Sequence, residues 1–206
     1  MLSRALAVFE PLAIFALIMV YIWDLRFRLP WLWVLILGLM VFSHVMRRER
    51  PAALGFRATN LRECLRRYGP WIGLVALLLV ACGMMLHTVR RILVGDALRD
   101  WAFYVPWGLC QQYMLNGYFF IRFKALVGPT MAPMVVVALF SMAHLPNWFL
   151  MAAALAGGYA SVRVYRETKN LYFLGLAHAA VGFLVFLVVP DSVTHHLRVG
   201  PGWYRF

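Results

Sequence analysis

Long apolar runs recur along the whole chain, and this feature constrains the fold more than any other. A helix needs about 20 residues to cross the hydrocarbon of a bilayer. Of 206 residues 64% are hydrophobic and only 14% are charged, more apolar surface than a soluble fold could bury. The sequence therefore predicts one all-α domain over residues 1–206, a polytopic bundle of about seven, possibly eight, transmembrane helices. The predicted spans are 5–23, 30–46, 70–87, 101–121, 131–145, 147–164 and 171–189.

The segments between the spans are basic or rich in turn residues. Residues 47–70 hold seven arginines, with Leu61, Cys64 and Leu65 on one helical face. That pattern suits a helix lying on the membrane surface, but a solvated basic loop fits it equally well. The sequence RFKALVGPT at 122–130 predicts a turn, and the aromatic and basic tail 190–206 is typical of a membrane interface.

The amino-terminal run is expected to be a retained first span. It is too long for the apolar region of a signal peptide, is interrupted by Glu10 and Pro11, and lacks a small-residue cleavage site. The three cysteines show neither metal-ligand spacing nor a paired pattern, so we expect reduced or buried thiols. They are Cys64, Cys82 and Cys110.

The basic residues predict the orientation of the chain. The net charge is +12, but the basic residues collect between apolar segments, where topology and anionic lipid headgroups explain them better than nucleic acid. With the amino terminus in the cytoplasm, thirteen of the twenty Lys and Arg face the cytoplasm. We expect a multi-pass protein of a prokaryotic inner (plasma) membrane, with lipids as partners and no nucleic acid.

Three clusters of polar residues lie inside the predicted spans, where hydrocarbon satisfies no hydrogen bond. The first is QQYMLN, in which Gln112 and Asn116 are four residues apart on one face and Gln111 lies about 100° away. An intramembrane histidine or amide can also serve helix packing. Amides and histidines on three separate helices nevertheless favour a shared polar cavity.

The other two clusters each centre on a histidine. FSMAHLPN carries Phe140 and His144 four residues apart, followed by Pro146, which weakens the helix and leaves backbone carbonyls free. HAAVG places His178 in the middle of the last predicted span, four residues before Gly182.

The order and spacing of these motifs resemble the CPBP family of intramembrane proteases, which includes type II CAAX prenyl endopeptidases and their bacterial relatives. The family pattern is Glu-Glu-x-x-x-Arg, then Phe-x-x-x-His, then His-x-x-x-Asn or a similar small residue. In this chain QQYMLN, FSMAH and HAAVG occupy the three positions, and the resemblance covers roughly residues 70–185.

The resemblance implies a role for each matched position. In the family the first Glu is the general base that activates the attacking water, one histidine assists it, and the other histidine and the Asn help bind the oxyanion. Here Gln111 replaces the base and Gln112 the second acid, while Asn116 replaces the Arg. His144 and His178 are kept, and Gly182 replaces the Asn; Phe140 and Gly182 are the expected substrate contacts.

The first motif departs from the family in a concerted way. An amide cannot take a proton from water at physiological pH, and general-base catalysis contributes about 10²–10⁴-fold. An Arg beside two neutral amides would be an unpaired charge at membrane depth, which is costly. Replacement of all three residues gives a neutral set that can hydrogen bond internally, as expected of a natural variant lineage.

Several groups remain candidates to replace the missing base. Glu10 is the one acid clearly inside an apolar span, and it reaches the cavity or lies near the interface. Either histidine could act as base. Cys110, next to Gln111, is a weaker candidate nucleophile because the helical offset turns it away. We expect no cofactor; zinc at His144 and His178 is weakly supported because the nearby amides are poor zinc ligands.

The sequence thus predicts a CPBP-type intramembrane peptidase acting on a membrane-associated or lipidated peptide, with doubtful activity. The alternative from a different class is a pseudoprotease that binds such a peptide without cutting it. A transporter or channel is disfavoured because no inverted repeat or charge-lined path is visible.

Overall fold

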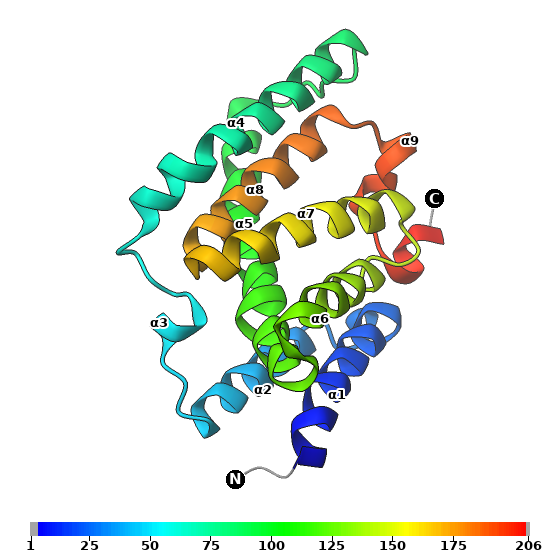
Figure 1. Cartoon of the computed structure of the whole chain (residues 1–206). Helices are drawn as coiled ribbons and strands as arrows, with labels where there is room; N and C mark the ends of the chain where they lie inside the picture. The colour runs from blue at the N-terminus through cyan, green and yellow to red at the C-terminus, as the bar shows by residue number, and fades with distance from the viewer. Residues whose placement is uncertain (1–3, 205–206) are drawn as a thin grey trace.

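The computed structural model describes residues 4–204, which are helical with no strand. The helices are α1 (Arg4–Trp23), η1 (Leu25–Phe27), α2 (Leu32–Met46), α3 (Pro51–Leu54), α4 (Leu61–Met85), α5 (Val94–Gln112), η2 (Tyr113–Phe120), α6 (Ile121–Met142), α7 (Trp148–Thr168), α8 (Leu171–Val188), α9 (Asp191–Thr194), η3 (His195–Leu197) and η4 (Gly200–Tyr204). Figure 1 shows α4, α7 and α8 running side by side across α5, with α1 and α2 near α6. The all-α prediction is confirmed.

The basic segment 47–70 is divided between a connector, residues 47–60, and the first part of helix α4, residues 61–70. Pro51 starts the single turn α3, and Gly55 ends it with a φ of 106°. The end of α3 is held against the end of α7, because the Tyr165 hydroxyl donates to the Leu54 carbonyl at 2.7 Å. Leu54 is therefore buried, and residues 47–60 form a packed connector.

Helix α4 begins nine residues before the span predicted at 70–87. It passes Pro70 without a break, although a proline removes one backbone hydrogen bond. The apolar face expected at Leu61, Cys64 and Leu65 explains only in part why α4 begins before residue 70. Cys64 is buried against the core, but Leu65 is 49% exposed.

Helices α5, η2 and α6 follow one another without a loop as far as Gly128, whose φ of 80° and ψ of 168° are non-helical but accessible to glycine. This break lies within the turn predicted at 122–130, while residues 122–127 before it are helical. The segment η2 is a π-helix. Such wider turns occur mostly as short insertions at functional sites, and this one follows directly after Gln112.

Helices α7 and α8 begin at asparagine caps. The side chain of Asn147 accepts from the Leu150 backbone N–H, and Asn170 caps α8 in the same way through Phe173. α7 runs four residues past its predicted end and stops at Thr168, where the cap residue Lys169 adopts a left-handed conformation. In the tail, Arg205 and Phe206 lie outside the described residues.

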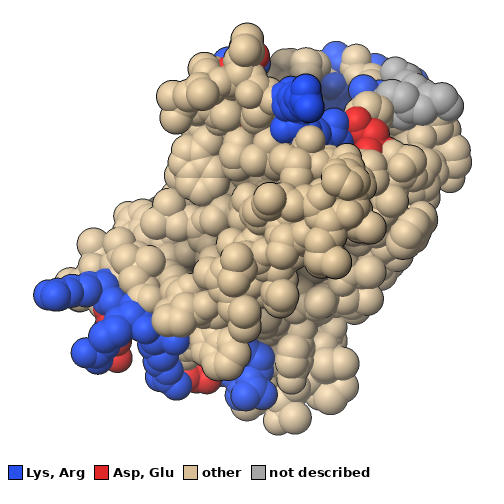
Figure 2. Space-filling view, turned by 90° about the horizontal axis from the view of Figure 1, so that it is seen from above, with Lys and Arg blue, Asp and Glu red and all other residues tan. Residues whose placement is uncertain are grey.

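Charged groups collect at opposite ends of the molecule. Figure 2 shows Lys and Arg in two groups on this face, separated by a broad band of uncharged surface. At one end Arg67 pairs with Glu167 at 2.6 Å, and at the other Arg90 pairs with Asp191. This distribution matches a protein that spans a bilayer.

Three helical runs among the described residues are long and apolar enough to cross a membrane: Leu61–Met85, Val94–Met142 and Leu171–Val188. Val8–Trp23 and Leu32–Met46 are shorter apolar helices. The bundle is compatible with a polytopic membrane protein. The count of seven or eight spans stays a prediction.

Candidate functional site

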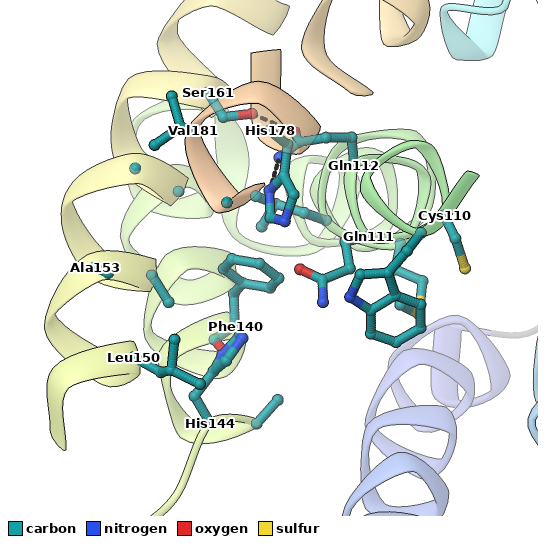
Figure 3. Close-up of a pocket in the computed structure, with 18 of the residues that line it drawn as sticks. Cys110, Gln111, Gln112, Phe140, His144, Leu150, Ala153, Ser161, His178 and Val181 are labelled. Carbon is teal, nitrogen blue, oxygen red and sulfur yellow. Dashed lines mark hydrogen bonds between the residues drawn. The ribbon is translucent and has the colours of Figure 1, made fainter. Parts of the chain in front are cut away.

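A large pocket lies among the helices and has a volume of about 1370 Å³. Its wall is mainly apolar, with aromatic side chains from several helices. Gln111, Gln112, His144 and His178 all line it, so the three sequence motifs meet at one cavity. Figure 3 shows Gln111 and Phe140 facing each other across this space, with His178 on one side and His144 on the other.

The first motif forms a buried hydrogen-bond cluster behind the pocket wall. Asn116 is fully buried, and its amide nitrogen donates to Gln112 Oε1 at 2.8 Å, as expected from their spacing. The same nitrogen donates to the Ser161 hydroxyl at 2.8 Å, and that hydroxyl in turn donates to Gln112 Oε1. Asn116 thus supports the wall but does not line the cavity.

His178 is linked to this cluster from α8. Its Nδ1 atom lies 3.2 Å from Gln112 Nε2, so the first and third motifs are in direct contact. The half-buried ring faces the pocket. The contact joins α5 to α8 through side chains at the pocket wall.

His144 lies on the turn that follows α6. Its Nδ1 atom lies 2.7 Å from the carbonyl oxygen of Phe140, and the two rings meet edge to face with centroids 5.0 Å apart. A carbonyl freed at the helix end therefore orients the second histidine, and Phe140 forms its apolar support.

Gln111 and Gly182 also line the pocket. Within residues 4–204 the Gln111 amide has no hydrogen-bond partner, in contrast to Gln112. A Cβ atom on Gly182 would lie 3.4 Å from the Tyr104 ring, so a small side chain fits beside it. Gln111 is the polar group of the first motif that is free to meet a ligand.

Close packing of α5 against α8 holds the motifs in register. A Cβ atom on Gly108 would lie 2.7 Å from the Gly175 carbonyl oxygen, and one on Gly175 would lie 2.8 Å from Leu109 Cα. Only glycine permits this approach. The backbones carrying Gln112 and His178 are thereby brought close enough for their side chains to bond.

Carboxylates are scarce around the pocket. Among the described residues that line it, the one acid is Asp100, eleven residues before Gln111 and about 16 Å away at 1.5 Å per residue. Cys110 lines the pocket, but Figure 3 shows its sulfur directed away from Gln111. Within residues 4–204 no three His, Cys, Asp or Glu side chains are grouped as a metal site requires.

Glu10 belongs to a separate ionic cluster and does not line the pocket. Its carboxylate pairs with Arg47 at 2.5 Å and accepts hydrogen bonds from Ser43 and from Tyr118, the latter at 2.9 Å. Arg122 continues the cluster with hydrogen bonds to both carboxylate oxygens of Glu49, each of 2.8 Å. These interactions join α1, α2 and α6.

Ser161 is a site residue that the sequence reading missed. It lines the pocket and bonds to both Gln112 and Asn116. The available signal was one serine in the run AGGYAS on the predicted span 147–164. Because Ser161 lies outside all three motifs, little in the sequence assigned it to the site.

The comparisons with known proteins agree with the order of the motifs. Residues 101–184 match the family model described as Type II CAAX prenyl endopeptidase Rce1-like. That range runs from the early part of α5 to Leu184 of α8 and contains all three motifs. No curated protein and no solved structure matches the chain significantly.

The match confirms the resemblance drawn from the motifs and, with the apolar helices, indicates an integral membrane protein. Residues 101–184 are therefore similar to the Rce1-like domain of type II CAAX prenyl endopeptidases.

Proposed function

We propose that the chain is a divergent CPBP-type intramembrane peptidase whose pocket binds a membrane-associated or lipidated peptide. The observation that carries the proposal is the meeting of Gln111, Gln112, His144 and His178 at one cavity. Its volume of about 1370 Å³ and its apolar, aromatic wall suit a hydrophobic ligand with a few polar groups.

The proposed reaction is attack of water on a peptide carbonyl, without a cofactor. His144 and His178 position the water and the developing oxyanion. Because none of the carboxylates in residues 4–204 lies beside Gln111, the reaction lacks the family's carboxylate base, and general-base catalysis contributes about 10²–10⁴-fold. We therefore expect slow turnover.

A second candidate is a pseudoprotease that binds the peptide and releases it intact. The observation that favours it is the closed set of bonds among Gln112, Asn116 and Ser161. These amides serve one another in place of a charged triad, so the pocket is stable without catalytic acid.

We place the protein in a prokaryotic inner (plasma) membrane with its amino terminus in the cytoplasm. The support is the separation of Lys and Arg into two groups (Figure 2). The predicted topology, in turn, puts thirteen of the twenty, Arg47–Arg67 among them, on the cytoplasmic side.

The test is cleavage of lipidated peptides by the purified protein in liposomes, followed by mass spectrometry of the products. Wild type is compared with His144→Ala and His178→Ala. Slow cleavage that either substitution abolishes supports the peptidase. Saturable binding without products supports the pseudoprotease, and absence of both binding and cleavage contradicts the two candidates together.

A further inference from the structure

The orientation of the Gln112 amide is determined by its buried neighbours. Oε1 accepts from Asn116 Nδ2 and from the Ser161 hydroxyl. All three side chains are nearly inaccessible, with exposures of 4% for Gln112, 0% for Asn116 and 8% for Ser161. Gln112 Nε2 is consequently the atom directed at His178.

The reversed arrangement of both amides is less favourable. In the structure the unpartnered buried atom of Asn116 is its carbonyl oxygen Oδ1. Reversal would put the NH₂ group at that position and leave two buried N–H donors without acceptors. Orphaned N–H groups are rarer in proteins than orphaned carbonyl oxygens, and each costs the full desolvation penalty.

An amide nitrogen only donates, so the contact with Gln112 Nε2 requires a lone pair on His178 Nδ1. The ring proton of neutral His178 then resides on Nε2. Within residues 4–204 this Nε2 atom has no hydrogen-bond partner, and the ring lines the pocket. His178 therefore presents an N–H donor to the cavity.

His144 has the opposite tautomer. A backbone carbonyl only accepts, so the 2.7 Å contact with the Phe140 oxygen requires a proton on His144 Nδ1. In the neutral ring Nε2 then carries the lone pair, and it too lacks a partner in the described part of the chain. His144 presents an acceptor to the cavity, from the other side of the Phe140 ring (Figure 3).

We propose that Gln112 is a positioning residue that makes His178 a hydrogen-bond donor, so that the pocket recognises a secondary amide through paired donor and acceptor histidines. The amide oxygen accepts from His178 Nε2–H, and the amide N–H donates to His144 Nε2. A carboxylate at position 112 would accept from Nδ1–H and leave Nε2 as an acceptor. The Gln therefore reverses the polarity of the histidine.

Other ligand chemistries fit this pair less well. A carboxylate needs two donors and would meet the lone pair of His144, and an ester has no N–H to give to it. Recognition of a peptide amide rests on the proposed function, whereas the two tautomers are properties of the protein without ligand.

The tautomers are measured directly by long-range ¹H–¹⁵N spectra of ring-labelled histidine in nanodiscs at neutral pH. His178→Asn and His144→Asn assign the two rings. We expect a proton on Nε2 of His178 and on Nδ1 of His144. Gln112→Glu should move the His178 proton to Nδ1 and leave His144 unchanged.

Two variants of Ser161 separate positioning from general stability. Ser161→Ala should mix the two tautomers of His178, and Ser161→Thr, which keeps the hydroxyl, should restore the wild-type signal. A proton on Nδ1 of His178 in wild type overturns the inference, and this result needs no variant to fold.

Ligand recognition is tested with a palmitoylated dipeptide and its depsipeptide analogue, in which an ester oxygen replaces the amide N–H. Wild type should bind the amide roughly 2- to 10-fold more tightly, the range for one net hydrogen bond. Equal affinity overturns amide recognition, and absence of binding to either probe contradicts the proposed function. If the two histidines have the opposite tautomers but the amide is still preferred, only the role of Gln112 is overturned.

Discussion

Gly108 of α5 lies so close to Gly175 of α8 that a Cβ atom on Gly108 would approach the Gly175 carbonyl oxygen to 2.7 Å. Real Cβ atoms do not make this contact, so the two helices must separate to accept any larger side chain. Because Gln112 and His178 sit one turn beyond this crossing on the two helices, the geometry of the site depends on it.

Gly108→Ala should therefore destabilise the protein by about 1–3 kcal/mol, the usual range for overpacking. Gly157→Ala is the matched control, since a Cβ atom at Gly157 meets nothing within 4 Å. It should be neutral or stabilising by up to about 1 kcal/mol from helix propensity. Thermal unfolding in one detergent compares them, and equal midpoints would contradict the close helix crossing.

The buried pair of Arg122 and Glu49 should contribute far more to stability than the exposed pair of Arg67 and Glu167. The Arg122 side chain is 6% exposed, whereas Arg67 is 60% exposed. Arg122→Met removes both hydrogen bonds from the guanidinium to the Glu49 carboxylate and should cost about 3–5 kcal/mol. Arg67→Met should lower the free energy of unfolding by about 1 kcal/mol or less. Similar decreases for both variants would contradict the claim that the ionic cluster stabilises the packing of α1, α2 and α6.

Acid should weaken the same cluster. Burial alone would raise the pKa of the Glu49 carboxyl, but hydrogen bonds from Arg122 and His44 outweigh it and hold that pKa below its usual value. A lowered folded-state pKa gives stability that is complete above the unfolded value of about 4.3 and is lost as the pH falls through the folded value.

Unfolding midpoints measured below about pH 5 should therefore fall more steeply in wild type than in Glu49→Gln. The variant lacks the carboxylate, so its own midpoint should be lower at neutral pH. Parallel curves for the two proteins would show that Glu49 does not contribute through ionisation.

Single cysteines test the proposed orientation in a background without the native three. Thr59→Cys lies in the connector between α3 and α4, and Arg91→Cys lies between α4 and α5; both positions are exposed. A membrane-impermeant thiol reagent added to intact cells should label Arg91→Cys only. Labelling of Thr59→Cys alone would invert the topology, as the basic connector would then face outward.

The sequence predicts α1, α2, α7 and α8 to within a few residues because each is an apolar run bounded by charged or turn residues. It fails where a local rule is overridden by packing. Pro70 signals a helix start, yet α4 begins at Leu61 because Cys64 already faces the core. The π-helix of η2 has no signature in composition, since Gly117 and the aromatic residues around it suit several helical geometries.

At the site, too, the sequence predicts local contacts and misses contacts between distant segments. The motif spacings predict the contact of Gln112 with Asn116, because four residues correspond to one helical turn. The fate of Glu10 could not be predicted, since its partners Arg47 and Tyr118 lie 37 and 108 residues away in the sequence. Ser161 was missed for a similar reason: it belongs to α7, whereas its partners Gln112 and Asn116 belong to α5 and η2.

The most direct test of the account is the rate at which Gln111→Glu cleaves a lipidated peptide in proteoliposomes, compared with wild type. Gln111 faces the pocket without a partner, so a carboxylate there meets water and both histidines remain in place. We expect a gain of about 10²-fold or more from the restored general base, and none for the Gln111→Ala control. Equal single-turnover rates for wild type and Gln111→Glu, with peptide bound by both, would contradict the claim that the missing acid at position 111 limits this pocket.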